Sequence, residues 1–483
     1  MDLYEWKTKN ANARKYAHFD EKVSLDKVWD YISDPTNIVK HGFYPFIHYE
    51  KKFNKFTRKD GRGYIKEKSR HLCYSAHIDR YIYSYYGYLL NQKYNKYLEE
   101  RNMNLVAVAY RDNLHKNNIH FAKRAFDCIR ETKESFVIIG DFSHFFDSLD
   151  HGYLKKRMCD VLKVDMLSSD FYAVFKNITK YSIWELTELL KLNNLTDTEE
   201  DIQILNSKRK VLSEKDFKKH KKEFIIRHKE NYGIPQGSAI SAVLANVYMI
   251  VVDEQMYNLA NKYKGLYMRY SDDFIIILPG ISEDDFREIL NSIIDEIKQI
   301  PNLILQPDKT QIYKYRDTTL KSCNALFLKD VLNGKNEIDY LGFTFDGKEI
   351  TIRDKTISKY YYRLYRKLKT IVKNEGYTPS GKRISCKNLY EKYTVKGAHL
   401  KDSNGHIKGN FISYVQRAQK VFGENEPIDR KTRRHMLKIR RILDEVFYRF
   451  VEDFRIFIDK RLKKIYYICG LIKQTVRYGG CYA

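Results

Sequence analysis

The chain has 483 residues and a formal net charge of +25, because 87 Lys and Arg outnumber 62 Asp and Glu. This excess favours a polyanionic partner, and a nucleic acid more than a membrane surface. We expect a cytoplasmic protein with no membrane segment, zinc ribbon or disulfide framework, since the sequence contains no bilayer-length apolar run, signal-peptide plan or Cys-x-x-Cys pair.

Residues 1–60 are interpreted as a basic, helical N-terminal region. A short extended run then carries Arg70, with Lys66 and Lys68 beside it, and leads into a helix over residues 81–100. The three cations could grip a triphosphate. Taken alone, the cluster is explained as well by a charged edge strand protected against aggregation.

The next informative stretch covers residues 136–151. An apolar strand ends at Asp141, an aromatic-rich turn follows, and Ser148 or Asp150 can cap the helix after it. An acid at the end of a buried strand is well placed to bind a metal. We interpret Asp147 as a cap or an ion-pair partner.

Residues 185–230 are rich in charge and poor in apolar runs, so we expect an insertion with a solvated helix. A Gly-Ile-Pro-Gln-Gly loop over residues 233–237 follows, and a helix rich in small residues is expected from about Ser238. Gln236 could reach a nucleotide from this loop. Tight helix packing explains the small residues but not the Pro-Gln-Gly.

Residues 265–278 have the pattern of a β-hairpin, with apolar runs on both sides of a polar turn. The turn contains the adjacent acids Asp272 and Asp273. Two neighbouring carboxylates repel each other, and a divalent cation would offset this repulsion. An isolated Asp-Asp is more simply a solvated turn, so the rest of the chain has to decide.

Four further segments follow in order. Residues 282–299 predict an amphipathic helix, and residues 303–310 predict an extended run with a turn that presents Lys309. A pair of β-like segments is expected next, and the second of them covers residues 338–345. From residue 356 onward the chain is predicted to be helical and strongly basic.

As an ordered set, these segments resemble reverse transcriptases, particularly the bacterial group with intron-encoded, retron and defence-associated enzymes. The resemblance covers roughly residues 60–350. It implies an α+β right-hand polymerase, with fingers and palm over residues 61–350 and an antiparallel sheet carrying the Tyr-Ser-Asp-Asp hairpin. An all-helical basic thumb and a C-terminal helical extension would follow over residues 351–483.

The resemblance also implies roles for individual residues. Asp141, Asp272 and Asp273 would be the catalytic metal-binding acids, with the backbone carbonyl of Phe142 as a further ligand. The metal would be two Mg²⁺ ions, with Mn²⁺ as the alternative. Phe146 would be the steric gate that excludes a ribose 2′ hydroxyl, which makes dNTP the expected substrate.

Further positions match the nucleotide and primer contacts of the family. Arg70, Gln236 and Lys309 would bind the dNTP, with Lys66 or Lys68 as helpers of Arg70. The primer grip would consist of Tyr340, Leu341, Gly342 and Phe343. The basic helices beyond it would track the duplex by phosphate contacts.

The departures from the family pattern narrow the expected class. The chain has Ser271 where many relatives have Ala or Met, keeps Pro-Gln-Gly unlike the diversity-generating class, and shows no integrase, RNase H or His-rich endonuclease motif. What remains most resembles the antiphage or abortive-infection reverse transcriptases, which are often paired with a noncoding RNA, and such an RNA would be the template copied into DNA here. The alternatives are a template-independent DNA polymerase and a maturase-like RNA-binding protein. An RNA polymerase is disfavoured by Phe146.

The template sequence, the phage trigger, the oligomeric state and the priming mode stay open, with a homo-oligomer and a tyrosine of residues 477–483 as the primer among the alternatives.

Overall fold

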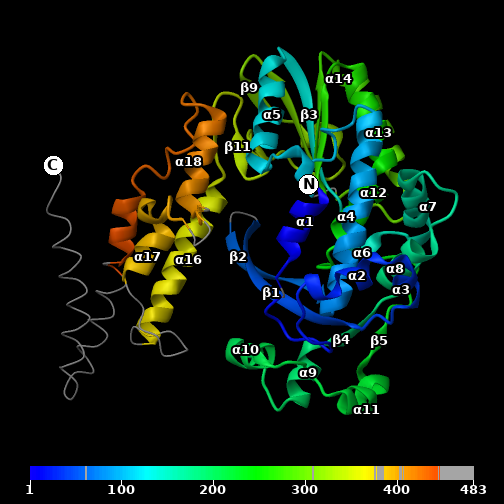
Figure 1. Cartoon of the computed structure of the whole chain (residues 1–483). Helices are drawn as coiled ribbons and strands as arrows, with labels where there is room; N and C mark the ends of the chain where they lie inside the picture. Colours follow the sequence, from blue (N-terminus) through cyan, green and yellow to red (C-terminus); the bar gives the residue numbers. More distant parts are fainter. Residues whose placement is uncertain are drawn as a thin grey trace, which may run out of the picture. The chain divides into compact units, whose positions relative to one another are not determined.

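The computed structural model describes residues 1–443 and 445, except residue 13 and residues 60–61, 307–308, 375–376, 378–385, 402–404 and 406 (Figure 1). They form two compact units. The first contains residues 1–117 and 127–335, and the second contains residues 118–126 and the described residues from 336 onward. This division differs from the predicted boundary at residue 350, because residues 336–350 belong to the second unit.

The first unit is built on an antiparallel sheet of five strands in the order β6-β7-β3-β8-β9. Its central strand is β3 (Glu134–Asp141), which pairs with β7 (Asp273–Pro279) and β8 (Gln311–Arg316). The edge strands are β6 (Leu266–Tyr270) and β9 (Thr319–Ser322). The predicted hairpin is confirmed as β6 and β7.

Two helices, α13 (Ile250–Lys262) and α14 (Glu283–Lys298), pack on this sheet. The ring of Phe286 on α14 stacks on Phe136 of β3, with 4.1 Å between ring centroids. Ser282 caps α14 by accepting a hydrogen bond from the backbone N–H of Asp285, which agrees with the helix predicted over residues 282–299. β3 is therefore held from its face as well as from both edges.

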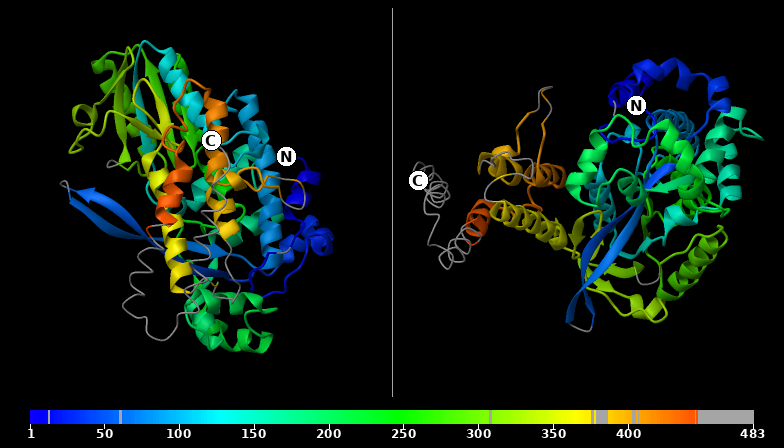
Figure 2. Two further views of the ribbon diagram at one scale, coloured as in Figure 1. Left: turned by 90° about the vertical axis from the view of Figure 1, so that its left-hand side faces the viewer. Right: turned by 90° about the horizontal axis from the view of Figure 1, so that it is seen from below.

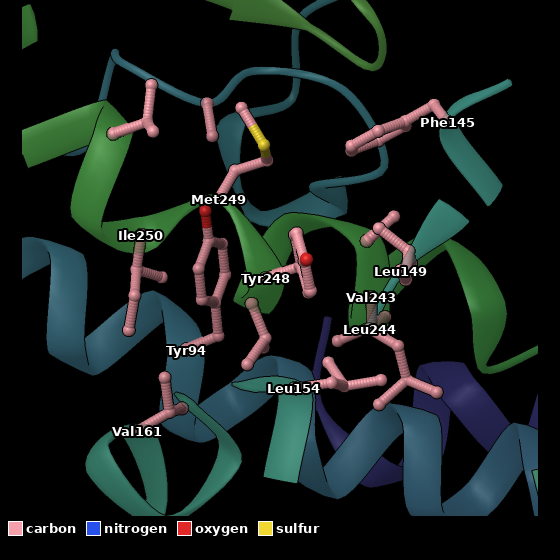
Figure 3. Packing of buried hydrophobic residues seen from close by; sticks show 14 of the residues in the cluster. Tyr94, Phe145, Leu149, Leu154, Val161, Val243, Leu244, Tyr248, Met249 and Ile250 are labelled. Carbon is pink, nitrogen blue, oxygen red and sulfur yellow. The ribbon is translucent and has the colours of Figure 1, made fainter. Parts of the chain in front are cut away.

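A cluster of buried side chains joins α4 (His77–Glu100), α7 (His151–Leu162) and α12 (Ser241–Tyr248). Figure 3 shows Tyr94 of α4, Leu154 of α7 and Tyr248 of α12 in this cluster. The small residues expected from Ser238 onward do mark a helix, which begins at Ser241. α12 packs chiefly on α7 and α4.

A second sheet of four strands has the order β2-β1-β4-β5. Its long strands are β1 (Phe46–Lys59) and β2 (Arg62–Tyr74), which Figure 2 shows as an extended ribbon. The short strands are β4 (Ser182–Glu185) and β5 (Ile226–Arg227). The expectation of a helical region up to residue 60 is thus corrected: β1 pairs with β2 on one side and β4 on the other, and these distant partners decide its conformation.

The predicted insertion over residues 185–230 is also more structured than expected. It contains α9 (Leu186–Leu192), α10 (Glu199–Ser207) and α11 (Glu214–Phe224). Leucines of α9 and α10 share a hydrophobic cluster with the adjacent Trp184 and with Phe19, which lies far away in the sequence. α11 has no fully buried residue, in keeping with the expected solvated helix, but its Phe217 and Phe224 pack against this cluster.

The second unit contains a three-stranded sheet and a group of helices. The strands are β10 (Ile338–Tyr340), β11 (Phe343–Phe345) and β12 (Ile350–Ile352). The helices are α16 (Asp354–Lys373), α17 (Cys386–Tyr393), η4 (Val395–Gly397) and α18 (Phe411–Phe422), followed by a helical stretch over residues 435–443. The predicted C-terminal helical extension beyond residue 445 lies outside the described residues.

The remaining elements complete an α+β fold. They are α1 (Leu3–Asn10), η1 (Asp26–Val28), α2 (Trp29–Ser33), α3 (Pro35–Lys40), η2 (Asp112–Leu114), α5 (Asn118–Glu131), α6 (Phe145–Ser148), α8 (Ser169–Thr179) and α15 (Asn324–Phe327). Among the described residues, no helix has both the length and the apolar character to cross a membrane.

Candidate active site

Two carboxylates face each other at one end of the five-stranded sheet, and a third acid stands next to them in the turn before β7. β3 ends at Asp141 and β7 begins at Asp273, and these two residues lie directly opposite each other in the antiparallel register. The backbone N–H of Phe142 donates to the carbonyl of Asp272 at 3.3 Å, which joins the third acid to the end of β3. Residues opposite each other have Cβ atoms about 4.5–5.5 Å apart, and like charges at that distance are destabilising. The arrangement therefore favours a bound cation.

Lys309 supplies a positive charge at this end of the sheet. Its Nζ lies 2.5 Å from Oδ1 of Asp141. The backbone N–H of Gln306 donates to the carbonyl of Asp141 at 2.9 Å, and that of Ser143 donates to the carbonyl of Ile304 at 2.9 Å. These two bonds fix the segment that carries Lys309 alongside the end of β3.

The three acids offer the oxygen ligands that hard divalent cations prefer. In the described part of the chain, no three or more His, Cys, Asp and Glu side chains are grouped so that they could hold a metal ion, so the three acids are not gathered into a ready ligand set. A divalent ion at the end of β3 would complete its coordination shell with water and substrate phosphate oxygens, as Mg²⁺ usually does. The carboxylates therefore fit a divalent cation only together with water and substrate phosphate oxygens.

The turn between β6 and β7 is held by a buried ion pair that the sequence interpretation missed. Ser271 has a left-handed backbone (φ +63°), and its carbonyl accepts a 2.8 Å hydrogen bond from an Nη of Arg269. Arg269 also forms a two-pronged ion pair with Asp253, and both side chains have 0% exposure. Burial alone would lower the pKa of Arg269, but Asp253 raises it above its ordinary value. An arginine within an apolar strand was the signal available in the sequence.

The loop over residues 233–237 joins two parts of the predicted nucleotide site. The N–H of Ile234 donates to the carbonyl of Phe146 at 2.9 Å, and the N–H of Cys73 donates to the carbonyl of Gln236 at 2.8 Å. Gly237 has φ +115°, and a Cβ there would lie 2.4 Å from the carbonyl oxygen of Cys73. Only glycine therefore allows this approach to β2.

The aromatic turn after Asp141 contains two neighbouring phenylalanines that differ in burial. Phe145 is 4% exposed and belongs to the main core, whereas Phe146 is half-buried beside it, with 5.7 Å between ring centroids. Asp150 caps α7 by accepting from the N–H of Tyr153 at 2.8 Å, which confirms one of the two predicted caps. Phe146 has an exposed part that a ligand could contact.

The predicted triphosphate ligands lie on β2. Arg70 is exposed and opposite Lys51, and its guanidinium lies 5.7 Å from the ring centroid of Phe53. Lys66 is exposed and Lys68 is half-buried on the same strand. Cys73, whose backbone N–H donates to the Gln236 carbonyl, lies three positions after Arg70. The structure thus joins β2 to the loop over residues 233–237 through the backbone. The Arg70 side chain itself points to Phe53.

The predicted primer grip forms the β10–β11 hairpin of the second unit. Tyr340 and Phe343 are buried at 1% and 0% exposure and anchor this hairpin in its own core. The turn residues Leu341 and Gly342 have φ of +48° and +97°, and the carbonyl of Leu341 accepts a 2.9 Å bond from Asn118. The part of this hairpin available to a ligand is therefore its turn.

Comparison with solved structures finds distant likeness to yeast telomerases. Apo telomerase from Candida tropicalis truncated from its C-terminal domain is 12% identical, with 69% of this chain and 61% of that chain covered and a TM-score of 0.39. Telomerase from Candida albicans in complex with a fragment of telomeric RNA is 13% identical, with 83% and 59% covered and a TM-score of 0.38. The chain thus spans about three fifths of these telomerase chains, and likeness at this level indicates neither substrate nor partner.

Comparison with curated proteins gives no match. In contrast, residues 88–345 match the sequence profile of the family described as reverse transcriptase (RNA-dependent DNA polymerase). The match covers more than half of the chain and includes all three carboxylates, the aromatic turn, the Pro-Gln-Gly loop and Lys309. The chain therefore belongs to the reverse transcriptase family.

Proposed function

We propose that this protein is an RNA-directed DNA polymerase, a nucleotidyltransferase that adds dNTPs to a DNA strand on an RNA template. The observation that carries the proposal is the pairing of Asp141 with Asp273 at the end of β3, with Asp272 joined to the same point through Phe142. Carboxylates at the end of a strand, with a lysine beside them, suit phosphoryl transfer. This reaction depends on positioning the reacting groups and on stabilising the charge of the transferred phosphate.

Each residue of the site would have its own role in the reaction. The acids, with the Phe142 carbonyl, would hold divalent metal, which reverse transcriptases generally use and which would supply Lewis-acid stabilisation of phosphate oxygens. Lys309 is placed to pair with phosphate charge once it leaves Asp141. Phe146 would exclude a ribose 2′ hydroxyl, and Gln236 and Arg70 would contact the incoming dNTP. The turn at Leu341 and Gly342 would touch the primer.

The finer parts of the proposal rest on the sequence resemblance. They are two Mg²⁺ ions as the cofactor, a noncoding RNA as the template, a cytoplasmic location and a role in bacterial antiphage defence. The excess of positive charge supports a nucleic-acid partner. The choice of Mg²⁺ is supported by the carboxylate donors, which Mg²⁺ prefers together with substrate phosphates.

The test is incorporation of labelled dNTP by a purified Asp272→Asn, Asp273→Asn variant. We expect incorporation to fall below detection while the unfolding temperature stays close to that of the parent protein. Asp317→Asn is the matched control, because Asp317 is an exposed acid with positive φ in the β8–β9 turn of the same sheet. Full activity of the double variant would refute the proposal.

A second experiment separates this function from its rivals. The DNA product is sequenced after expression with and without a candidate RNA. A product complementary to the RNA supports templated synthesis, whereas the same product without RNA indicates a template-independent polymerase. Phage protection that survives Asp272→Asn, Asp273→Asn would favour a maturase-like RNA-binding role.

A further inference from the structure

The inference concerns the buried ion pair behind the hairpin turn, and it rests on the proposed function. Arg269 uses Nε and one Nη to bind both oxygens of Asp253, at 2.8 and 2.7 Å. Its other Nη donates to the carbonyl of Ser271 at 2.8 Å and to Oδ1 of Asn246 at 3.2 Å. The guanidinium is therefore spread over three partners, one of which is the turn itself.

The pair is anchored in several elements of the first unit. Asp253 lies on α13 and also accepts from the hydroxyl of Tyr267 at 2.8 Å. Asn246 lies on α12 and donates to the carbonyl of Ala109 at 3.0 Å. The backbone of Arg269 donates to Val106 and accepts from Val108. Movement of Arg269 would thus require the surrounding core to move.

The bond to Ser271 has a geometric consequence for the next residue. The carbonyl of Ser271 and the N–H of Asp272 belong to the same planar peptide unit. Holding this carbonyl fixes the plane of the unit and the position of the Asp272 Cα. The bond from the N–H of Phe142 to the Asp272 carbonyl holds the next peptide unit, and the two planes together set the direction of the Asp272 Cβ. The hydroxyl of Tyr110 lies 3.1 Å from Oγ of Ser271 and gives the turn a second hold.

Stability alone does not account for the pair. A buried ion pair contributes little to folding, because the cost of removing two charges from water offsets their attraction, and an apolar pair of similar size often serves as well. An apolar pair could not donate to Ser271. We propose that Arg269 is a positioning residue that holds the Ser271 carbonyl and thereby orients Asp272 towards a divalent cation.

The test replaces the pair in two ways and measures metal affinity directly. Arg269→Met, Asp253→Leu removes both charges together, so no buried charge is left unpaired. Arg269→Lys keeps a positive charge for Asp253 but has no second nitrogen for Ser271. Binding of Mn²⁺ to the folded protein is followed by electron paramagnetic resonance, and the unfolding temperature is measured in parallel.

We expect both variants to bind Mn²⁺ at least about tenfold more weakly, the loss typical when a residue supporting a metal ligand is removed. The Mn²⁺ concentration for half-maximal dNTP incorporation should rise by a similar factor. A merely structural role would lower the amount of folded protein without changing this midpoint. If the double variant does not fold, Arg269→Lys decides alone. Unchanged Mn²⁺ affinity in the folded variants would overturn the inference.

Asp272→Asn separates failure of this inference from failure of the proposed function. If Asp272→Asn weakens Mn²⁺ binding and the Arg269 variants do not, only the positioning role is wrong. If Asp272→Asn binds Mn²⁺ as the parent protein does, Asp272 is not a metal ligand, and both the metal site and the role of Arg269 are refuted.

Discussion

The ammonium of Lys309 lies 2.5 Å from a carboxylate oxygen of Asp141, although the two residues are 168 positions apart in the chain. The side chain of Lys309 is 42% exposed, and solvent-exposed ion pairs add at most about 1 kcal/mol to folding stability. The contact therefore contributes little to folding, and the role of Lys309 in the proposed site can be tested separately from stability.

Replacement of Lys309 should affect catalysis much more than stability. We expect Lys309→Met to lower kcat/KM for dNTP by roughly 100-fold, at the low end of effects for a lost catalytic charge or proton donor. The unfolding temperature should change little. Steady-state incorporation assays and thermal unfolding measure the two effects.

Lys321→Met is the matched control for Lys309, because Lys321 is an exposed lysine on β9 of the same sheet. It should leave both quantities unchanged. Equal kcat/KM in the two variants would show that Lys309 does not act at the site.

Phe146→Ala should relax the choice between sugars. The ring is half-buried beside Phe145, so its exposed part is available to a nucleotide. Its removal should raise the ratio of rNTP to dNTP incorporation by roughly 10- to 200-fold, the range for one steric element of a pocket. Single-nucleotide incorporation with each substrate measures the ratio, and unchanged selectivity would contradict the gate.

Gly237→Ala should disturb the contact between the loop and β2. The added Cβ would meet the carbonyl of Cys73 at 2.4 Å in a backbone conformation that costs roughly 1–3 kcal/mol for a non-glycine residue. We expect a lower unfolding temperature and a higher KM for dNTP. Gly280→Ala is the control, since Gly280 also has positive φ (+64°) but has no atom within 4 Å of an added Cβ.

Stability should fall as the pH drops below about 6.5, partly because of His18. Burial lowers the pKa of His18 to about 3, from an ordinary value of 6.5. The folded protein keeps this ring neutral where the unfolded chain is already protonated, so acid favours unfolding between these two values. At pH 5.5 this one residue should cost about 1.4 kcal/mol relative to pH 7.5.

Urea unfolding of His18→Gln at both pH values tests this effect. The variant should lose less stability than the parent protein between pH 7.5 and pH 5.5. His399→Gln, which changes an exposed histidine, should keep the parent's dependence on pH. An equal loss in His18→Gln and the parent would exclude His18 as a source of acid sensitivity.

Patterns among neighbouring residues were enough to predict several elements. The apolar run ending at Asp141 predicted β3, the two runs around Ser271 predicted the β6–β7 hairpin, and Ser282 predicted the start of α14. These predictions succeed because side-chain periodicity and caps act within a few residues of the chain. β1 and the core of residues 185–230 were misread, because their partners lie far away in the sequence.

The sequence by itself determined which residue types are available at the site: a strand-end acid, two turn acids, a loop glutamine and a lysine. Only the tertiary structure decided that Asp141 faces Asp273, that Lys309 pairs with Asp141, and that Arg269 is buried against Asp253 beneath Ser271. The physical reason is that register and burial depend on contacts between distant segments, whereas residue type and local propensity do not.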